Sequence, residues 1–163
     1  MERIEIIGSN YSGSFRNVRT ACRAVVLEDE KILLSYEKEN DLYMIPGGGM
    51  EEGEDPETCA MREVSEETGY TVELSEFFIE IDEYYQDWKY ITYYYPARII
   101  GSCERRLTES EKERGLTPVF IPFNTAMEIF SSYEAYADTD EEKHGIYLRE
   151  WTALNALFNE VRE

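Results

Sequence analysis

The segment that most restricts what this chain can fold into is residues 47–70, GGGMEEGEDPETCAMREVSEETGY. Three glycines lead into a run of carboxylates in which Arg62 is the one cation. No lysine occurs between Lys38 and Lys89, so nothing close in the sequence balances the remaining negative charge. Because like charges on neighbouring positions destabilise a helix, this segment needs a partner that stabilises it.

The second half of this segment carries start and stop signals for a helix over residues 56–68. Pro56 suits the first helical turn, because its missing N–H has no helical partner to lose there. Asp55 precedes it as an N-cap, and Gly69 follows as the residue that ends the helix. The sequence therefore predicts a loop of glycines and carboxylates followed directly by a helix.

Three glutamates share one face of this predicted helix, because Glu63, Glu66 and Glu67 follow the i, i+3, i+4 spacing. The repulsion of one i, i+4 pair destabilises an isolated helix by about 0.2–0.5 kcal/mol. A divalent cation removes the repulsion, and oxygen ligands gathered on one face suit Mg²⁺ or Mn²⁺, which also bind substrate phosphates. The carbonyl of Gly47 could complete the coordination shell. The alternative is an acidic face that is only solvated, as charge runs usually are.

Arg62 lies next to Glu63 in the sequence but points in another direction from the helix axis. Its side chain can reach back to Glu54 or Glu51 and form a bidentate hydrogen bond. The role expected for Arg62 is therefore to fix the preceding loop onto the helix.

The spacing of these residues resembles the Nudix box, the signature of hydrolases that act on a nucleoside diphosphate linked to another group. The pattern consists of Gly48, five residues, Glu54, seven residues and then REVSEETG over residues 62–69. Tyr70, which ends the box, is the one departure, at a position where the family prefers an aliphatic residue that packs rather than reacts. Residues 43–48, YMIPGG, also resemble the strand and Pro-Gly-Gly that lead into the box.

The resemblance implies an α/β (α+β) fold, namely an α/β/α sandwich with a mixed β-sheet. It implies a catalytic centre formed by charged residues of the box: Glu54, Arg62, Glu63, Glu66 and Glu67. Among these, the last three glutamates hold the metal together with the carbonyl of Gly47, while Arg62 and Glu54 orient them. The implied cofactor is Mg²⁺ or Mn²⁺.

Apolar patterns outside the box predict strands and helices in mixed order, which suits a sheet between helices. The predicted strands are residues 3–7, 19–27, 31–36, 43–45, 71–82, 88–100 and 117–121, with a tight turn at residues 28–30. The other predicted helices are residues 124–132 and 148–161, and residues 107–115 are predicted to be irregular. The chain has 163 residues, 42% of them hydrophobic, and no linker or repeat, so we expect a single Nudix hydrolase domain over residues 1–163.

Composition argues against several classes of function. A formal net charge of −19 leaves no basic track for polymeric nucleic acid. Cys22, Cys59 and Cys103 are too widely spaced for a disulfide framework or a Cys-x-x-Cys metal site. Without an apparent signal peptide or an apolar segment of spanning length, we expect a cytoplasmic protein with no membrane partner. His144 is the only histidine, so a His-based triad is not expected, and we expect it in a solvent-facing loop.

Hydrolysis of a diphosphate needs a group that accepts a proton from the attacking water, and family members differ in where this base lies. The segment RLTESEKERG supplies Glu109, Glu111 and Glu113. We expect Glu113 to be the base, because it lies just before the strand that begins at Thr117. A charged loop exposed to solvent is the alternative for each of these glutamates.

Two residues are candidates for substrate binding. Arg23 lies in a strand expected to face the box and can hold a phosphate, although a surface role fits it equally well. Gly48 lets the backbone come close to the substrate. Aromatic residues of segment 84–95 can stack on a base or sugar, although alternating tyrosines are more often packing residues. The expected substrate is a small nucleotide-type diphosphate: a nucleotide, nucleotide sugar or dinucleoside polyphosphate.

Two other functions are compatible with the same fold. A catalytically silent nucleotide-binding or regulatory protein would usually lose glutamates of the box, whereas this chain keeps all of them. An isomerase acting on a prenyl diphosphate would need a reactive cysteine and glutamate in its pocket, and neither Cys59 nor Cys22 lies in a recognisable motif. A homodimer is common on this fold, and the aromatic segment could form its surface.

Overall fold

The computed structural model describes residues 2–76 and 79–160. The strands are β1 (Glu2–Ile7), β2 (Phe15–Glu28), β3 (Lys31–Glu37), β4 (Leu42–Met44), β5 (Gly47–Gly49), β6 (Tyr70–Leu74), β7 (Ile79–Tyr85), β8 (Asp87–Ser102) and β9 (Leu116–Pro122). The helices are α1 (Pro56–Thr68), α2 (Glu109–Glu113), α3 (Phe123–Ser131), the 3₁₀ helix η1 (Ser132–Tyr136) and α4 (Glu141–Glu160).

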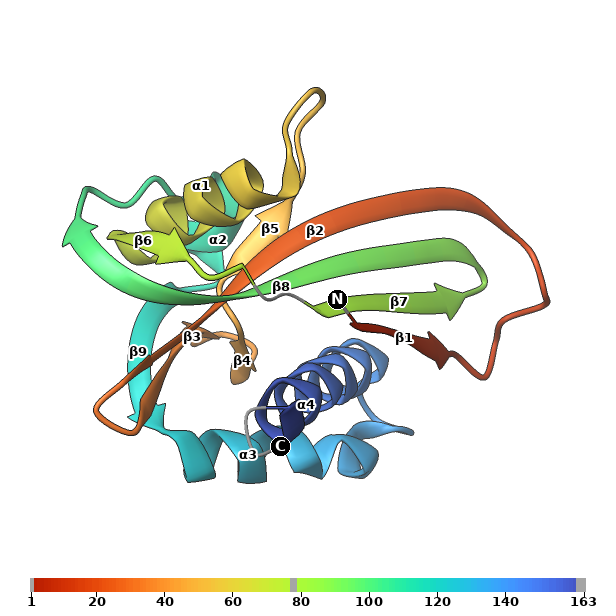
Figure 1. Cartoon of the computed structure of the whole chain (residues 1–163). Coiled ribbons are helices and arrows are strands. Elements are labelled where there is room, and N and C mark those ends of the chain that lie inside the picture. The colour runs from red at the N-terminus through yellow and green to blue at the C-terminus, as the bar shows by residue number, and fades with distance from the viewer. Residues whose placement is uncertain (1, 77–78, 161–163) are drawn as a thin grey trace.

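The strands form a mixed sheet with the path β1-β7-β8-β2-β3-β4, and β5, β6 and β9 pair with β2, β8 and β3. Helix α1 covers one face of the sheet, and α3 and α4 lie on the other side (Figure 1). This arrangement confirms the predicted α/β/α sandwich with a mixed sheet. Among the described residues, no helix has the length and apolar character needed to cross a membrane.

The long strands β2 and β8 run parallel at the centre of the sheet. Their register places Arg19 opposite Tyr90 and Ala21 opposite Thr92, and β7 continues the row with Glu83 opposite Tyr90. Because side chains alternate between faces along a strand, these residues all point to the same face of the sheet. Tyr94, on the same face of β8, packs in one cluster with Tyr147 and Leu154 of α4, so this face turns toward α4.

Two apolar layers hold the helices on the sheet. Val64 on α1 packs with Val26, Leu33 and Val72. The larger cluster, on the opposite face, joins strand residues such as Leu34 to residues of α3 and α4: Phe130, Tyr147, Ala153, Leu154 and Leu157. Complete burial of one such large apolar side chain contributes about 1.5–3 kcal/mol. The core therefore fixes both helical layers relative to the sheet.

The hairpin between β2 and β3 has the turn that its sequence predicts. Glu28 pairs with Lys31, and the two residues between them, Asp29 and Glu30, have φ of 51° and 62°. Positive φ at both central residues is typical of the two-residue turn whose twist matches that of the flanking strands. This turn sets the register of β3 against β2.

Several predicted boundaries differ from the structure. The single strand expected at residues 71–82 is two strands, β6 and β7, which pair with successive parts of β8, and its residues 77 and 78 lie outside the described residues. Residues 107–115 are not wholly irregular, because they contain α2, whose capping box joins Thr108 and Glu111. The helix expected at 148–161 begins earlier, at Glu141, and its residue 161 is not described. The apolar pattern did not indicate this start, because the residues in the first turns of α4 are mostly polar.

Candidate active site

Helix α1 begins and ends as its sequence predicts. The side chain of Asp55 accepts a hydrogen bond from the backbone N–H of Thr58 at 2.8 Å. Gly69 has φ of 77°, and its N–H donates to the carbonyl of Ser65. These caps satisfy backbone groups that a helix end leaves open, so they fix where the helix starts and stops. The packing of Val64 against the sheet then sets the rotation of α1, and with it the direction of its glutamates.

Arg62 connects the loop before α1 to the helix. Its Nε and Nη2 donate to the two carboxylate oxygens of Glu54 at 2.6 and 2.9 Å. Nη2 also donates to the carbonyl of Gly49 at 3.1 Å, and Glu51 lies 3.7 Å from Nη1 as an ion pair. The hydrogen bonds from Arg62 lower the pKa of Glu54 to about 2. Both contacts that the spacing suggested, to Glu54 and to Glu51, are present.

The same guanidinium holds the first two glutamates of the predicted metal face. Arg62 Nη1 lies 2.9 Å from Glu63 and 3.2 Å from Glu66. Gly48 allows Glu63 to occupy this position, because a Cβ added at Gly48 would lie 2.4 Å from Glu63 Oε2. Burial raises the pKa of Glu63, against the opposing effect of Arg62. One cation therefore serves several carboxylates, and the group keeps excess negative charge.

Glu67 is the most buried of the three glutamates, with 8% of its surface exposed. Its Oε2 accepts hydrogen bonds from Ser35 Oγ at 3.0 Å and from the backbone N–H of Gly47 at 3.3 Å. Burial raises the pKa of Glu67 to about 8, while the charge of Arg23 acts in the opposite direction. A carboxylate in this position lacks a full countercharge from the protein.

The donors at this end of α1 suit a divalent metal ion. Within the described residues, no group of three or more metal-ligating side chains is already arranged around one point. Instead, Glu63 and Glu66 turn toward Arg62, and Glu67 toward Ser35 and Gly47. The set consists only of hard oxygen atoms, it carries surplus negative charge, and one member is buried with a raised pKa. These are the features that Mg²⁺ or Mn²⁺ would satisfy.

Gly47 lies where only glycine fits. Its φ is 157°, and an added Cβ would lie 2.2 Å from the carbonyl oxygen of Cys22. The close approach follows from the pairing of β5 with β2, in which Gly47 stands opposite Arg23. This pairing brings the Gly47 backbone beside both Arg23 and Glu67.

Arg23 is brought to the site as predicted. Its Nη1 donates to the carbonyl of Ile45 at 2.7 Å, whereas its buried Nε has no hydrogen-bond partner among the described residues. The Arg23 charge lowers the pKa of Glu67, which places the guanidinium within electrostatic reach of the buried carboxylate. Arg23 is thus a cation at the edge of an otherwise acidic group.

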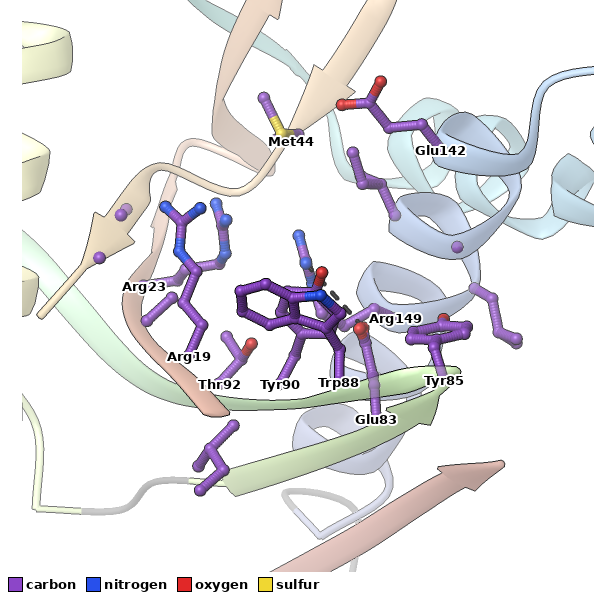
Figure 2. A pocket seen from close by; sticks show the side chains of 18 of the residues that line it. Arg19, Arg23, Met44, Glu83, Tyr85, Trp88, Tyr90, Thr92, Glu142 and Arg149 are labelled. Carbon is purple, nitrogen blue, oxygen red and sulfur yellow. Dashed lines mark ion pairs between the residues drawn. The ribbon is translucent and has the colours of Figure 1, made fainter. Parts of the chain in front are cut away.

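A cleft of about 1250 Å³ joins these residues to the far end of the sheet. It is lined at one end by Gly48, Arg62 and the three glutamates of α1, and at the other by residues of β7, β8 and α4. Figure 2 shows several of the latter projecting into the same space. The cleft is therefore much longer than the carboxylate group alone requires.

The expected base is not among the residues that line the cleft. Glu113 is exposed on α2, whereas Glu111 lines the cleft. The charge of Glu111 contributes to the raised pKa of both Glu63 and Glu67. Glu111 is also the third helical residue of the capping box of α2, in which it accepts from the backbone N–H of Thr108, a feature that the TESE sequence of residues 108–111 could have revealed.

Sequence reasoning missed other residues of the cleft. The most relevant are Arg19, Glu83 and Arg149, whereas Trp88 belongs to the aromatic segment 84–95 that was predicted as a possible stacking surface. His144 was expected in a solvent-facing loop, but it lies half-buried in α4 and lines the cleft. Arg19 had a readable signal, since it is four positions before Arg23 in the same strand and so faces the same side. The sequence held no such signal for Glu83 and Arg149, because the residues that contact them are far away in the sequence.

Comparison with known proteins agrees with this geometry. The NUDIX domain family model matches residues 18–157. The chain belongs to the Nudix family. Arg19, Glu83 and Trp88, which lie outside the box, fall within the matched range.

Individual relatives match smaller parts. A human diphosphoinositol polyphosphate phosphohydrolase is 44% identical over 77 residues, which are 47% of this chain and 42% of the relative. A putative ADP-ribose pyrophosphatase of Bacillus subtilis is 29% identical over 115 residues, 69% of this chain and 54% of the relative. The chain spans about half the length of the curated relatives it matches.

Among solved structures, a Nudix hydrolase from Nitrosomonas europaea superimposes with a TM-score of 0.51 and 21% identity, over 66% of this chain and 74% of the other. At this identity the similarity supports the fold alone. The two curated relatives have names that state different substrates.

Proposed function

We propose that this protein is a metal-dependent pyrophosphohydrolase that cleaves a nucleoside diphosphate linked to another group. The observation that carries the proposal is the buried Glu67, with its raised pKa, beside Glu63 and Glu66 in a cleft whose wall holds Arg23. An acidic group that needs a divalent cation, next to an arginine that can hold a phosphate, suits a phosphoric anhydride. Membership of the Nudix family supports the same reaction class.

In the proposed reaction, the oxygen of a water molecule attacks one phosphorus atom of the diphosphate. The new O–P bond forms as the bridging O–P bond breaks, and its electron pair leaves with the departing phosphate. We assign the role of base to Glu111 in place of Glu113, because Glu111 lines the cleft and Glu113 does not. Bound Mg²⁺ or Mn²⁺, held by Glu63, Glu66, Glu67 and the Gly47 carbonyl, would neutralise phosphate charge and acidify the water.

Arg62 and Glu54 act as positioning residues in this proposal. Their bidentate pair fixes the loop of residues 49–55 against α1, so that the carboxylates and the Gly48 backbone keep their relative places. Arg23 binds a phosphate oxygen, for which its buried Nε and its position opposite Gly47 prepare it. Gly48 leaves room for Glu63 and for the substrate together.

The diphosphate of the proposed substrate is attached to a nucleoside rather than to a highly phosphorylated inositol. Several relatives are named as diphosphoinositol polyphosphate phosphohydrolases, but their match covers 47% of this chain. An inositol polyphosphate needs several cations around it. The far wall of this cleft instead contributes Glu83, Glu141 and Glu142 beside Arg149. A nucleotide, nucleotide sugar or dinucleoside polyphosphate suits that wall better.

The proposal is tested by phosphate release from a panel of diphosphates in Mg²⁺ or Mn²⁺. The panel contains nucleotides, ADP-ribose, nucleotide sugars, dinucleoside polyphosphates, a diphosphoinositol polyphosphate and a prenyl diphosphate. We expect turnover that requires the metal and falls about 100-fold or more in Glu67→Gln. Glu57→Gln is the matched control, because Glu57 is an exposed glutamate in the first turn of the same helix.

Other outcomes would support other functions. Tight binding of nucleotides with no turnover in either metal would favour a silent binding protein. Isomerisation of the prenyl diphosphate would favour the isomerase. The homodimer, the cytoplasmic location and the single-domain organisation also remain predictions, which light scattering, fractionation and limited proteolysis can test.

A further inference from the structure

The far end of the cleft is a second polar site that the proposed chemistry does not use. Its floor is the face of the sheet that carries Trp88, Tyr90 and Glu83, and α4 supplies Arg149 from the other side. Figure 2 shows these side chains projecting into one space. The carboxylates of α1 line the opposite end of the same cleft.

Arg149 has hydrogen-bond partners at one edge of its guanidinium and an unpaired donor at the other edge. Its Nε donates to Tyr94 Oη at 2.9 Å and to Glu150 Oε1 at 3.0 Å. Glu150 is itself fixed, because it accepts from Tyr94 Oη and, at 2.6 Å, from the backbone N–H of Ile45. By contrast, Arg149 Nη2 is buried and has no hydrogen-bond partner among the described residues.

Glu83 is the acidic counterpart of this arginine. It is 4% exposed, and its Oε1 is buried without a hydrogen-bond partner within the described part of the chain. Arg149 Nη1 is 3.9 Å from Glu83 Oε1, beyond hydrogen-bonding distance. If the two residues served only as a buried ion pair, we would expect them to close to about 2.8 Å, since each unpaired buried group is destabilising. Their separation leaves a buried acceptor and a buried donor side by side.

Beside this pair lies an aromatic surface. The rings of Trp88 and Tyr90 are stacked, with centroids 5.5 Å apart and planes 12° apart. Trp88 retains 38% exposure and lines the cleft, so part of its ring is open to a ligand. Aromatic rings of this kind stack on nucleobases without regard to sequence, and a large planar base gains most from the contact.

We propose that this end of the cleft binds a guanine base, so that the substrate is a guanosine diphosphate linked to another group. Guanine presents two adjacent N–H groups, N1 and N2, which suit the carboxylate of Glu83, and its O6 accepts from Arg149. Adenine, cytosine and uracil each lack the pair of adjacent donors. In this arrangement the base stacks on Trp88, and its edge forms hydrogen bonds with the buried side chains of Glu83 and Arg149. This proposal rests on the proposed hydrolase function for the role of the diphosphate.

Two arginines connect the base site to the carboxylates. Arg19 and Arg23 lie on the same face of β2, opposite Tyr90 and Tyr94 of β8. Arg19 also approaches the loop before α1, since its Nη2 would lie 3.3 Å from a Cβ at Gly49. A nucleotide with its base on Trp88 therefore has cations along the path that its phosphates follow toward Glu67.

The first experiment measures equilibrium binding and is independent of catalysis. GMP, AMP, CMP and UMP are titrated into the whole protein in EDTA by calorimetry. We expect GMP to bind roughly 10- to 100-fold more tightly than AMP, the range of one well-formed bidentate base contact. In Glu83→Gln this ratio should fall to within about threefold, because a glutamine offers a single acceptor.

The matched control is Glu80→Gln. Glu80 lies on the same strand as Glu83 but on the opposite face, where it pairs with Arg3. The Glu80→Gln variant should retain the wild-type preference for GMP. Thermal melting of both variants confirms folding, and Trp88→Ala provides a second variant, which should weaken GMP and AMP by a similar factor and the smaller CMP and UMP by less.

The outcomes separate this proposal from the proposed function. Equal binding of all four nucleotides, or a preference that Glu83→Gln leaves intact, overturns the guanine site even if metal-dependent hydrolysis is found. Selective GMP binding that depends on Glu83, with no hydrolysis of any GDP-linked compound, keeps the site and overturns the hydrolase.

Discussion

The two ends of the cleft differ in how their polar groups find partners. At the α1 end, Arg62 and Glu54 are 8 residues apart in the sequence, and the remaining carboxylates follow on the same helix. At the far end, Tyr94 and Glu150 are 56 residues apart, and Ile45 and Glu150 are 105 apart. One end is assembled by a single loop and helix, and the other by the closing of the whole fold.

The ends also differ in what they lack. The α1 end has too few positive charges, because Arg62 alone serves Glu54, Glu63 and Glu66. The far end has a donor and an acceptor, on Arg149 and Glu83, that remain without partners in the described part of the chain. A cation would satisfy the first deficit, and a neutral group that both donates and accepts would satisfy the second. The comparison suggests that the cleft binds a charged diphosphate at one end and a polar ring at the other.

The largest effect is expected for Arg62→Met. The substitution removes the bidentate partner of Glu54 and the shared cation of Glu63 and Glu66. We expect kcat/KM for metal-dependent hydrolysis to fall roughly 100- to 1000-fold, because the loop and the carboxylates lose their common anchor. Arg98→Met is the control, since Arg98 is exposed and pairs with Glu73 across two strands. A folded Arg62→Met with activity within threefold of wild type would show that the loop needs no such anchor.

Gly48→Ala should have the next largest effect. The new Cβ would lie 2.4 Å from Glu63 Oε2, so the carboxylate has to move. We expect roughly a 10- to 100-fold loss of kcat/KM together with a higher Mg²⁺ concentration for half-maximal activity. Gly101→Ala is the control, because its Cβ would meet only the Thr71 side chain at 2.7 Å, away from the cleft. Unchanged Mg²⁺ dependence in Gly48→Ala would argue against Glu63 as a metal ligand.

The α1 end could be predicted from sequence because its information is local. The caps Asp55 and Gly69, the face shared by three glutamates and the Arg62–Glu54 contact all follow from spacing along one short segment. Gly47 and Gly48 were also identified, since only glycine permits the close backbone approach that the structure has at these positions. The alternation of strands and helices indicated a sheet between helices, and the resemblance to the Nudix box implied the α/β/α sandwich.

The far end could not be predicted in the same way. Glu83 lies one residue beyond the strand expected at residues 71–82, whereas in the structure it belongs to β7, and the break between β6 and β7 decides which face Glu83 occupies. Arg149 was placed in a helix but with no partner, because Tyr94 and Glu83 reach it only through tertiary packing. Glu113 was predicted to be the base, rather than Glu111, because it lies just before a strand. The rotation of the short helix α2 instead decides which of the two glutamates lines the cleft.

The raised pKa of Glu67 predicts a smaller effect, on stability. Its native pKa of about 8 lies above the unfolded value, so the native state holds this proton more tightly. The group therefore destabilises the native state increasingly as the pH rises from about 4.5 through about 8. We expect Glu67→Gln in EDTA at pH 8.5 to have a free energy of unfolding about 1–3 kcal/mol above wild type, with little difference at pH 5. Urea denaturation at both pH values measures this.

Bound metal should reverse the difference in free energy of unfolding between Glu67→Gln and wild type. Mg²⁺ should stabilise wild type and leave Glu67→Gln nearly unchanged, because the variant lacks the charged ligand. Equal stabilisation of both proteins by Mg²⁺ would contradict the assignment of Glu67 as a ligand. Glu57→Gln, on the exposed side of the same helix, should respond to Mg²⁺ as wild type does.

The smallest effect is expected for Tyr94→Phe, which tests the far end alone. The hydroxyl donates to Glu150 and accepts from Arg149 Nε at 2.9 Å, so its loss frees one edge of the arginine. We expect a free energy of unfolding lower by about 1–2 kcal/mol and a ratio of GMP to AMP affinity lower by about threefold. The Mg²⁺ dependence of hydrolysis should not change, since Tyr94 contacts none of the α1 carboxylates. Tyr36→Phe, which loses an exposed hydrogen bond to Asp41, is the control. If Tyr94→Phe instead altered metal dependence and left nucleotide preference intact, the two ends of the cleft would not be separate binding sites.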